Sequence, residues 1–403
     1  MRIKIVTAQS IGFFLCLLVT FLSVFFLESK KSGSIIELWM LAQVLLFVIL
    51  IRYLFTIRPS RIEYFFYFNL VLYFSIIALF EIFTSGASVI LTFILWMVVF
   101  SGTRAFYVFV SFINDDSFKK LTGGLLVISV AVMVYGQLQS LAFIFNLPFL
   151  DQVSRFRTVS GFRQVTSVFE EPAFYGLYLI GVYFLMRTLQ GKKYWLFFLL
   201  LVTQLLQTLS VGAVVGFILT HSFFVLLNKN KSSFSNGVRK SFYLLLIFPV
   251  VAYFLFKDGY FITRIQNEVF SSIQYLGSKP KITGDESSGM LRVINELNTL
   301  FYTLGNSPFF GFGFDYTDEL DRPMALNGIV EFFTRFGGIG FLLFVMWLST
   351  LYKSNKYKMT IVFVFFVISL IDGAISKIQF WFPLMYLMVL FSYQIRTSNC
   401  KIC

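Results

Sequence analysis

The sequence is poor in charge. Only 13% of its 403 residues are Asp, Glu, Lys or Arg, whereas a soluble domain has about 25%. Hydrophobic residues make up 58% of the chain, and 55 residues are Phe. This composition excludes a soluble globular protein. It predicts an all-α integral membrane protein with little soluble mass, built as one polytopic domain over residues 1–403.

Histidine and cysteine are also scarce. The chain has one histidine, His221, and three cysteines. A single histidine excludes a histidine-rich metal site and argues against a Ser-His-Asp triad. Cys400 and Cys403 form a lone CxxC with no second pair nearby, which favours an incidental tail over a zinc or redox site. We therefore expect no cofactor.

Apolar segments dominate what is present. At roughly 20 residues per crossing, the sequence predicts about twelve transmembrane helices. Their expected spans are 5–27, 35–56, 64–83, 87–111, 123–145, 173–190, 194–210, 211–227, 241–256, 329–351, 359–376 and 380–395.

The basic residues predict the orientation of these helices. The formal net charge is +13, and most Lys and Arg lie in short loops on one side, as in the pairs Lys119–Lys120 and Lys192–Lys193. By the positive-inside rule, both termini are expected in the cytoplasm. Two long loops, 146–172 and 257–328, then face outward. Because the basic residues follow the membrane topology, they do not indicate nucleic-acid binding.

The first outer loop carries a charged cluster next to the helix expected at 173–190. Ions at a bilayer boundary cost free energy unless they face water, a partner or a substrate. Guanidinium groups bind phosphate in a bidentate fork. We interpret the cluster as half of a site for an anionic, lipid-linked substrate. The alternative is that its arginines tie to lipid headgroups or to the two glutamates. The cluster consists of Arg155, Arg157, Arg163, Glu170 and Glu171.

The second outer loop is far longer than the roughly two to eight residues usual between helices. From Leu291 to Leu304, apolar residues recur at helical spacing, with Arg292 and Thr299 on the opposite face. This pattern predicts an amphipathic helix lying along the membrane surface. Pro308 follows and ends a helix.

Three polar residues recur at four-residue intervals where the helix expected at 329–351 begins. They are Asn327, Glu331 and Arg335, and they share one helix face. Glu331 and Arg335 are spaced as an i,i+4 ion pair. Two interpretations stay open with equal weight: a structural pair inside the bundle, or contact with a substrate.

Together these segments resemble the O-antigen polymerase and ligase group of bacterial envelope proteins. Residues 163–175, with Ser167, Phe169, Glu171 and Pro172, are similar to the R-x-x-S-x-F-x-E-P-a-F pattern of repeat-unit polymerases. Residues 289–340 are similar to the large outer loop and following helix of the group, and 208–212 resembles its helical hairpin without the arginine often found there. Ligases usually have a histidine where this chain has Asn327, so the polymerase interpretation is favoured.

The resemblance implies a membrane glycosyltransferase of the bacterial cytoplasmic (inner) membrane. Such enzymes act on undecaprenyl-diphosphate-linked oligosaccharides at the outer face. They transfer the growing glycan to the incoming lipid-linked repeat, building the O-antigen of lipopolysaccharide or a related surface polysaccharide. Besides membrane lipids, the expected partners are a chain-length regulator and a flippase.

The resemblance and the side-chain chemistry together suggest roles. Arginines stabilise the diphosphate leaving group, and one carboxylate takes the proton of the incoming hydroxyl. Acidic residues in the outer loops show no D-x-D or EF-hand spacing, so we expect no metal. The expected catalytic residues are Glu171 or Glu170 as base, with Arg163 and Arg292. The expected substrate-binding residues are Arg157, Arg155, Asn327, Arg322, Glu331 and Arg335.

Two other functions stay open. An O-antigen ligase would share the same lipid-linked donor. A flippase or secondary transporter of lipid-linked sugars would share the helices and an arginine-lined cavity. Transporters, however, place their charges near the midplane on broken helices, whereas the richest charged clusters here lie in the predicted outer loops.

Overall fold

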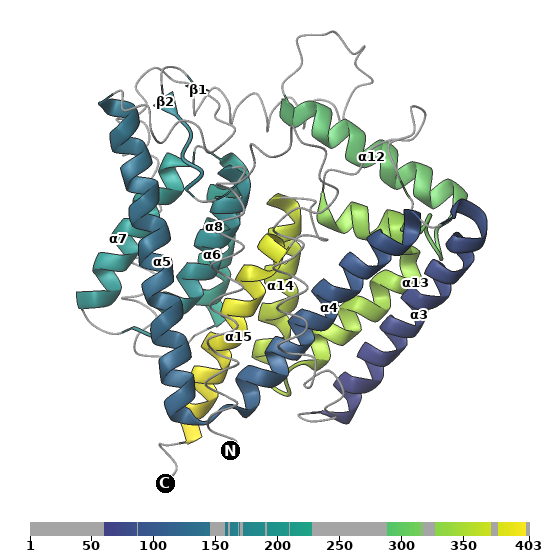
Figure 1. Cartoon of the computed structure of the whole chain (residues 1–403), viewed down its shortest axis with the longest axis horizontal. Coiled ribbons are helices and arrows are strands. Elements are labelled where there is room, and N and C mark those ends of the chain that lie inside the picture. Colours follow the sequence, from purple (N-terminus) through teal and green to yellow (C-terminus); the bar gives the residue numbers. More distant parts are fainter. Residues whose placement is uncertain are drawn as a thin grey trace.

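The described part of the chain is helical apart from one small strand pair (Figure 1). Two-residue strands β1, Thr158–Val159, and β2, Phe162–Arg163, form an antiparallel hairpin. The computed structural model describes residues 60–86, 88–145, 158–159, 162–167, 169, 172–189, 192–208, 210–227, 288–314, 316, 327–371 and 378–399.

The helices follow the apolar runs of the sequence. By length and composition, α3, α4, α5 and α13 are each able to cross a membrane. The spans expected at 5–27, 35–56 and 241–256 lie outside the described residues. The helices are α3 (Arg61–Ser85), α4 (Ser88–Phe112), α5 (Asp115–Ile144), α6 (Pro172–Met186), α7 (Lys192–Gln207), α8 (Val211–Leu227), α12 (Ser288–Asn306), α13 (Gly328–Thr350), α14 (Asn355–Ile371) and α15 (Ile378–Asn399).

Polar residues define where several helices begin. Ser60 accepts a hydrogen bond from the Glu63 backbone N–H at 3.4 Å. Asn114 likewise accepts one from Ser117 N–H at 2.8 Å at the start of α5. Pro172 is the first residue of α6, a position where its missing N–H costs nothing. These caps satisfy backbone groups that helix ends leave unpaired.

Apart from α12, which lies across one end, the described helices run along the bundle, so the bundle has two distinct ends (Figure 1). The β1–β2 hairpin and α12 lie at one end, and α15 finishes at the other (Figure 1). Short connections join α3 to α4, α4 to α5 and α13 to α14. The described parts of the two segments predicted as long outer loops therefore share one end of the bundle.

An aromatic cluster joins α3, α4, α13 and α15. The rings of Phe74 and Phe336 are 4.3 Å apart, and those of Phe100 and Trp381 are 5.1 Å apart. Trp96 lies 5.0 Å from Phe336. Such pairs add about 0.5–1.5 kcal/mol each beyond area burial. The cluster packs the first half of α13 against α3 and α4.

Helix α6 is the most enclosed element of the other half of the bundle. Almost every side chain from Phe174 to Met186 is buried. At Gly181, an added Cβ would lie 3.2 Å from the Cα of Pro383 in α15. Small residues let membrane helices approach this closely. The first turn of α6, directly after Glu170 and Glu171 in sequence, thus belongs to a tightly packed helix.

Candidate functional site

The structure describes the predicted site residues to different extents. Arg163 lies in β2 and Arg292 in α12, both described by their backbone. Asn327, Glu331 and Arg335 lie at the start of α13 with described side chains. The other predicted site residues lie outside the described residues: Arg155, Arg157, Glu170, Glu171 and Arg322.

Arg163 belongs to a paired strand. In the hairpin, Thr158 is opposite Arg163, and Val159 is opposite Phe162. The sequence predicted only a loop at 146–172, because two-residue strands are too short to show an alternating pattern. The hairpin fixes the backbone of Arg163 relative to the segment that follows it.

That segment turns into the bundle directly after β2. Gln164 through Ser167 are buried, as is Phe169. The side-chain amide of Gln139 in α5 clamps Ser167: the Ser167 N–H donates to Gln139 Oε1 at 2.7 Å, and Gln139 Nε2 donates to the Ser167 carbonyl at 2.9 Å. Ser167 Oγ donates to the Val132 carbonyl at 2.6 Å. These bonds hold Ser167 in the left-handed region, with φ of 51°, at a cost of about 1–3 kcal/mol.

A chain of amides holds the same segment from α7. The Val165 N–H donates to the Gln207 carbonyl at 3.0 Å. Tyr175 OH donates to Gln204 Oε1 at 2.6 Å, and Gln204 Nε2 donates to Gln207 Oε1 at 2.9 Å. Gln207 Nε2 donates in turn to Gln137 Oε1 at 3.3 Å. The residues on either side of Glu170–Glu171 are therefore anchored between α5 and α7.

These glutamines were not among the site residues predicted from the sequence. Their signal was present, because an amide inside an apolar helix must find a polar partner. Gln204 and Gln207 are also spaced three residues apart, which places them on one helix face. What the sequence did not show is that their partners lie in the segment before α6.

Helix α12 contacts the bundle through small hydroxyl residues. Thr299 and Thr303 are fully buried, whereas Phe301 is 66% exposed and Leu304 is 46% exposed. Thr303 Oγ1 donates to Thr334 Oγ1 of α13 at 3.2 Å. The sequence placed Thr299 on the polar face, opposite the apolar one, and the structure packs that hydroxyl side against protein. Small residues favour close helix contact, while lipid accepts the apolar side.

Helix α13 is broken at Gly337. Its φ of 60° and ψ of −170° are not helical, and a Cβ there would overlap the Phe309 carbonyl. Only glycine tolerates this combination. The break leaves backbone groups unpaired, and the segment after α12 satisfies them. The bonds are Gly338 N–H to Pro308 O at 2.8 Å, Ile339 N–H to Phe309 O at 3.2 Å, Phe312 N–H to Thr334 O at 2.8 Å and Gly313 N–H to Arg335 O at 2.7 Å.

Charged side chains secure the same segment. Arg335 Nε donates to Glu331 Oε1 at 3.1 Å, with both side chains about 15% exposed. Arg335 Nη1 donates to the Phe314 carbonyl at 2.7 Å, and the Phe314 N–H donates to Glu81 Oε2 at 2.8 Å. A Cβ at Gly313 would overlap the Glu81 carboxylate. Two helices, α3 and α13, thus hold one loop residue by both of its backbone groups.

Asn327 and Glu331 have different roles at the start of α13. Asn327 Oδ1 accepts from the backbone N–H groups of Ile329 at 2.8 Å and Val330 at 3.4 Å, so it caps the helix. Glu331 lies in the first turn, where the helix dipole favours negative charge. Within the described residues, no three His, Cys, Asp or Glu side chains come together as a metal site would require.

Two comparisons with known proteins find no match. No protein-family profile matches the sequence, and no curated protein matches it either. The function is therefore inferred from the residues themselves.

Proposed function

We propose that this protein polymerises undecaprenyl-diphosphate-linked oligosaccharide repeats at the outer face of the bacterial cytoplasmic membrane. In this proposal about twelve helices cross the bilayer, and both termini are cytoplasmic. The observation that supports it is the position of two arginine-bearing elements: β2, with Arg163, and α12, with Arg292, lie at the same end of the bundle (Figure 1). A membrane-boundary site for a diphosphate needs cations at one end of the bundle.

The reaction forms one glycosidic bond and breaks one bond to phosphate. A hydroxyl oxygen of the incoming repeat attacks the anomeric carbon of the growing glycan, and the bond from that carbon to the lipid diphosphate breaks. Glu171, or Glu170 beside it, takes the hydroxyl proton. Negative charge grows on the departing diphosphate, and Arg157, Arg163 and Arg292 stabilise it.

The described residues supply the frame for this chemistry. Gln139 and Gln207 hold the segment between β2 and α6. On the other side, Glu81 and Arg335 hold the segment that follows α12. Rigid support of this kind keeps catalytic groups in productive geometry and avoids reorganisation during reaction.

A product-size assay tests the proposal. Purified protein in liposomes is given an undecaprenyl-diphosphate-linked repeat, and the products are resolved by size. Wild type should give a ladder spaced by one repeat. Arg292→Ala and Glu171→Gln should each lower the rate about 10²-fold or more. Lys193→Ala removes an exposed charge at the start of α7 and should leave the ladder unchanged. An unchanged ladder in both site variants would refute the assignment.

The break in α13 favours a second candidate, a transporter of lipid-linked sugars. Charged residues on broken helices are typical of transporter sites, and Glu331 and Arg335 lie just before Gly337. This charged pair on a broken helix adds to the charged clusters expected in the outer loops. The same assay separates the candidates: a transporter moves the lipid across the bilayer without changing its size. A ligase would transfer the glycan to a different lipid acceptor.

A further inference from the structure

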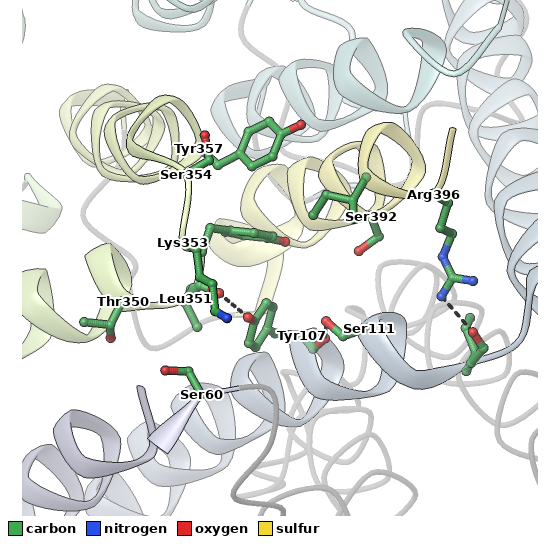
Figure 2. A pocket seen from close by; sticks show the side chains of 13 residues that line it. Ser60, Tyr107, Ser111, Thr350, Leu351, Lys353, Ser354, Tyr357, Ser392 and Arg396 are labelled. Carbon is green, nitrogen blue, oxygen red and sulfur yellow. Dashed lines mark hydrogen bonds between the residues drawn. The ribbon is translucent and has the colours of Figure 1, made fainter. Parts of the chain in front are cut away.

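A cavity of about 590 Å³ lies at the end of the bundle opposite α12 (Figure 2). Its size is within the range of about 300–1,000 Å³ typical of small-ligand sites. Four parts of the chain meet there: the residue before α3, the end of α4, the α13–α14 connection and the end of α15. The lining residues are Ser60, Tyr107, Ser111, Ile113, Thr350, Leu351, Tyr352, Lys353, Ser354, Tyr357, Ser392, Ile395 and Arg396.

Three hydroxyl groups of this cavity already donate their hydrogens to backbone carbonyls. Tyr107 OH donates to Leu351 O (Figure 2), Ser111 Oγ to Tyr107 O at 2.8 Å, and Thr350 Oγ1 to Trp347 O at 2.8 Å. Each such oxygen keeps lone pairs, but it has no second hydrogen to give. These groups therefore offer only acceptors to a ligand.

Other groups of the lining keep their donors. Ser60 Oγ accepts from the Glu63 N–H at 3.4 Å, which leaves the hydroxyl hydrogen of Ser60 to donate. Lys353, Ser354 and Tyr357 form no side-chain hydrogen bond with any residue that the structure describes. Lys353 and Ser354 are exposed, on the connection between α13 and α14. The cavity thus has hydrogen-bond donors on more than one side, and one of these donors is a cation (Figure 2).

Arg396 is the other cation of the lining, and its guanidinium is occupied. Nη1 donates to the Asp115 carboxylate, and Nη2 donates to the carbonyls of Val110 at 3.2 Å and Ile113 at 2.7 Å. Its guanidinium also lies 4.7 Å above the Phe118 ring. Arg396 therefore fixes the end of α15 to the α4–α5 turn. Of the two cations that line the cavity, Lys353 is the one available to a ligand.

Apolar surface completes the cavity. Ile113, Leu351, Tyr352 and Ile395 line it beside the polar groups. A ligand that matches this lining carries an anion, a hydrogen-bond donor and an apolar part. A phospholipid with a phosphate and a hydroxylated headgroup has all three. The ends of membrane-spanning helices are also where such headgroups lie.

We propose that this cavity binds the headgroup of an anionic phospholipid. Lys353 neutralises the phosphate, while Ser60, Ser354 and Tyr357, which lie on different sides of the cavity, donate hydrogen bonds to other oxygens of the headgroup and its ester groups (Figure 2). Tyr107 and Ser111 accept from the headgroup hydroxyls, while the apolar side chains contact the first part of the acyl chains. The proposal rests on the membrane placement of the helices and is independent of glycan polymerisation.

The test measures binding of a short-chain phosphatidylglycerol to delipidated, detergent-purified protein. Lys353→Ala should weaken binding about tenfold, because a hydrogen bond to a charged group is lost. Tyr357→Phe should weaken it about threefold. Lys358→Ala is the matched control: it removes a nearby lysine in the first turn of α14 that lies outside the cavity lining. Its affinity should stay within about twofold of wild type.

Two further probes identify the source of the phosphate. Phosphatidylcholine with the same acyl chains should bind at least about tenfold more weakly, because it has no net charge and no headgroup hydroxyl. Inorganic phosphate alone should compete poorly, because it lacks the apolar part. Equal weakening by Lys353→Ala and Lys358→Ala, or equal binding of the two lipids, would overturn the proposal. Phosphate binding as tightly as the lipid would overturn the lipid assignment in favour of a soluble anion. None of the probes carries a sugar, so failure here would leave the polymerase proposal standing.

Discussion

The protein holds two glutamate–arginine pairs in contrasting surroundings. Arg104 and Glu63 are fully buried between α3 and α4, whereas Arg335 and Glu331 on α13 are each about 15% exposed. In the first pair, Arg104 Nε and Nη2 reach both oxygens of Glu63, at 2.9 and 3.1 Å. Trp347 Nε1 adds a third bond to that carboxylate at 3.0 Å.

The difference lies in what each pair holds. Arg104 lies 4.7 Å from the centre of the Tyr67 ring in α3, so the described contacts of this pair connect helices α3, α4 and α13. Arg335 instead reaches past Glu331 to the Phe314 carbonyl, in a segment outside the helices. The buried pair connects helices, and the partly exposed Arg335–Glu331 pair holds the loop residue Phe314. The same pair of residue types thus stabilises helix packing in one place and positions a loop in the other.

The largest expected effect comes from breaking the buried pair. Arg104→Ala should lower the free energy of unfolding by about 3–5 kcal/mol, because Glu63 becomes an uncompensated buried charge. The measurement is an unfolding titration in mixed micelles. The double variant Arg104→Met with Glu63→Leu should recover a large part of the loss, since it removes both charges. A loss below about 1 kcal/mol in Arg104→Ala would contradict the role of this pair in helix packing.

A substitution at the break in α13 should have the next largest effect on stability. Gly337→Ala should destabilise the protein by about 2–4 kcal/mol, because its φ is positive and its Cβ would overlap the Phe309 carbonyl. Gly338→Ala is the control, since the nearest atom to its Cβ is 3.4 Å away. Parallel unfolding titrations compare the two. Equal destabilisation would show that the break does not depend on Gly337.

Loss of the Gln139 hydrogen bonds to Ser167 should have the third largest effect on stability. Gln139→Leu should cost about 1–3 kcal/mol, because the buried N–H and carbonyl of Ser167 lose their partners. Gln137→Leu removes only the far end of the amide chain, a 3.3 Å contact, and should cost less than about 1 kcal/mol. Trypsin cleavage after Arg163 provides a second readout, which should speed up in Gln139→Leu alone. The reverse order of the two variants would contradict the clamp.

The partly exposed Glu331–Arg335 pair should matter least for stability and more for activity. Glu331→Gln should change the free energy of unfolding by about 1 kcal/mol or less, because water screens a pair of this exposure. Polymerisation should still fall about tenfold, because Arg335 without its partner Glu331 no longer holds the Phe314 segment in one position. Unfolding and product ladders are measured on the same preparation. A stability loss as large as that of Arg104→Ala would erase the contrast between the pairs.

The sequence predicted much of the helical architecture, because long apolar runs are a local signal. The i,i+4 spacing likewise predicts the Glu331–Arg335 pair, which the structure has at 3.1 Å. The break at Gly337 was not predictable in this way. Apolar residues continue through it, and its backbone groups find partners in Pro308 and Phe309, well before α13 in the chain.

The candidate site was also only partly predictable from the sequence. Arginines and glutamates near helix ends stand out in a chain with so little charge, so residue type alone marked them. The supporting residues did not stand out. Gln139 meets Ser167, and Glu81 meets Phe314, only after the helices have packed. Contacts of this kind depend on helix arrangement, which local spacing does not encode.

The central claim is that the first outer segment and α12 form one site. The most direct test is a double-mutant cycle on polymerisation, with Arg163→Ala, Arg292→Ala and the double variant compared by kcat/KM. If both arginines stabilise the same diphosphate, the double variant should lose less than the sum of the single losses, with a coupling energy of about 0.5–3 kcal/mol. Strictly additive losses, or full activity in either single variant, would contradict a shared site.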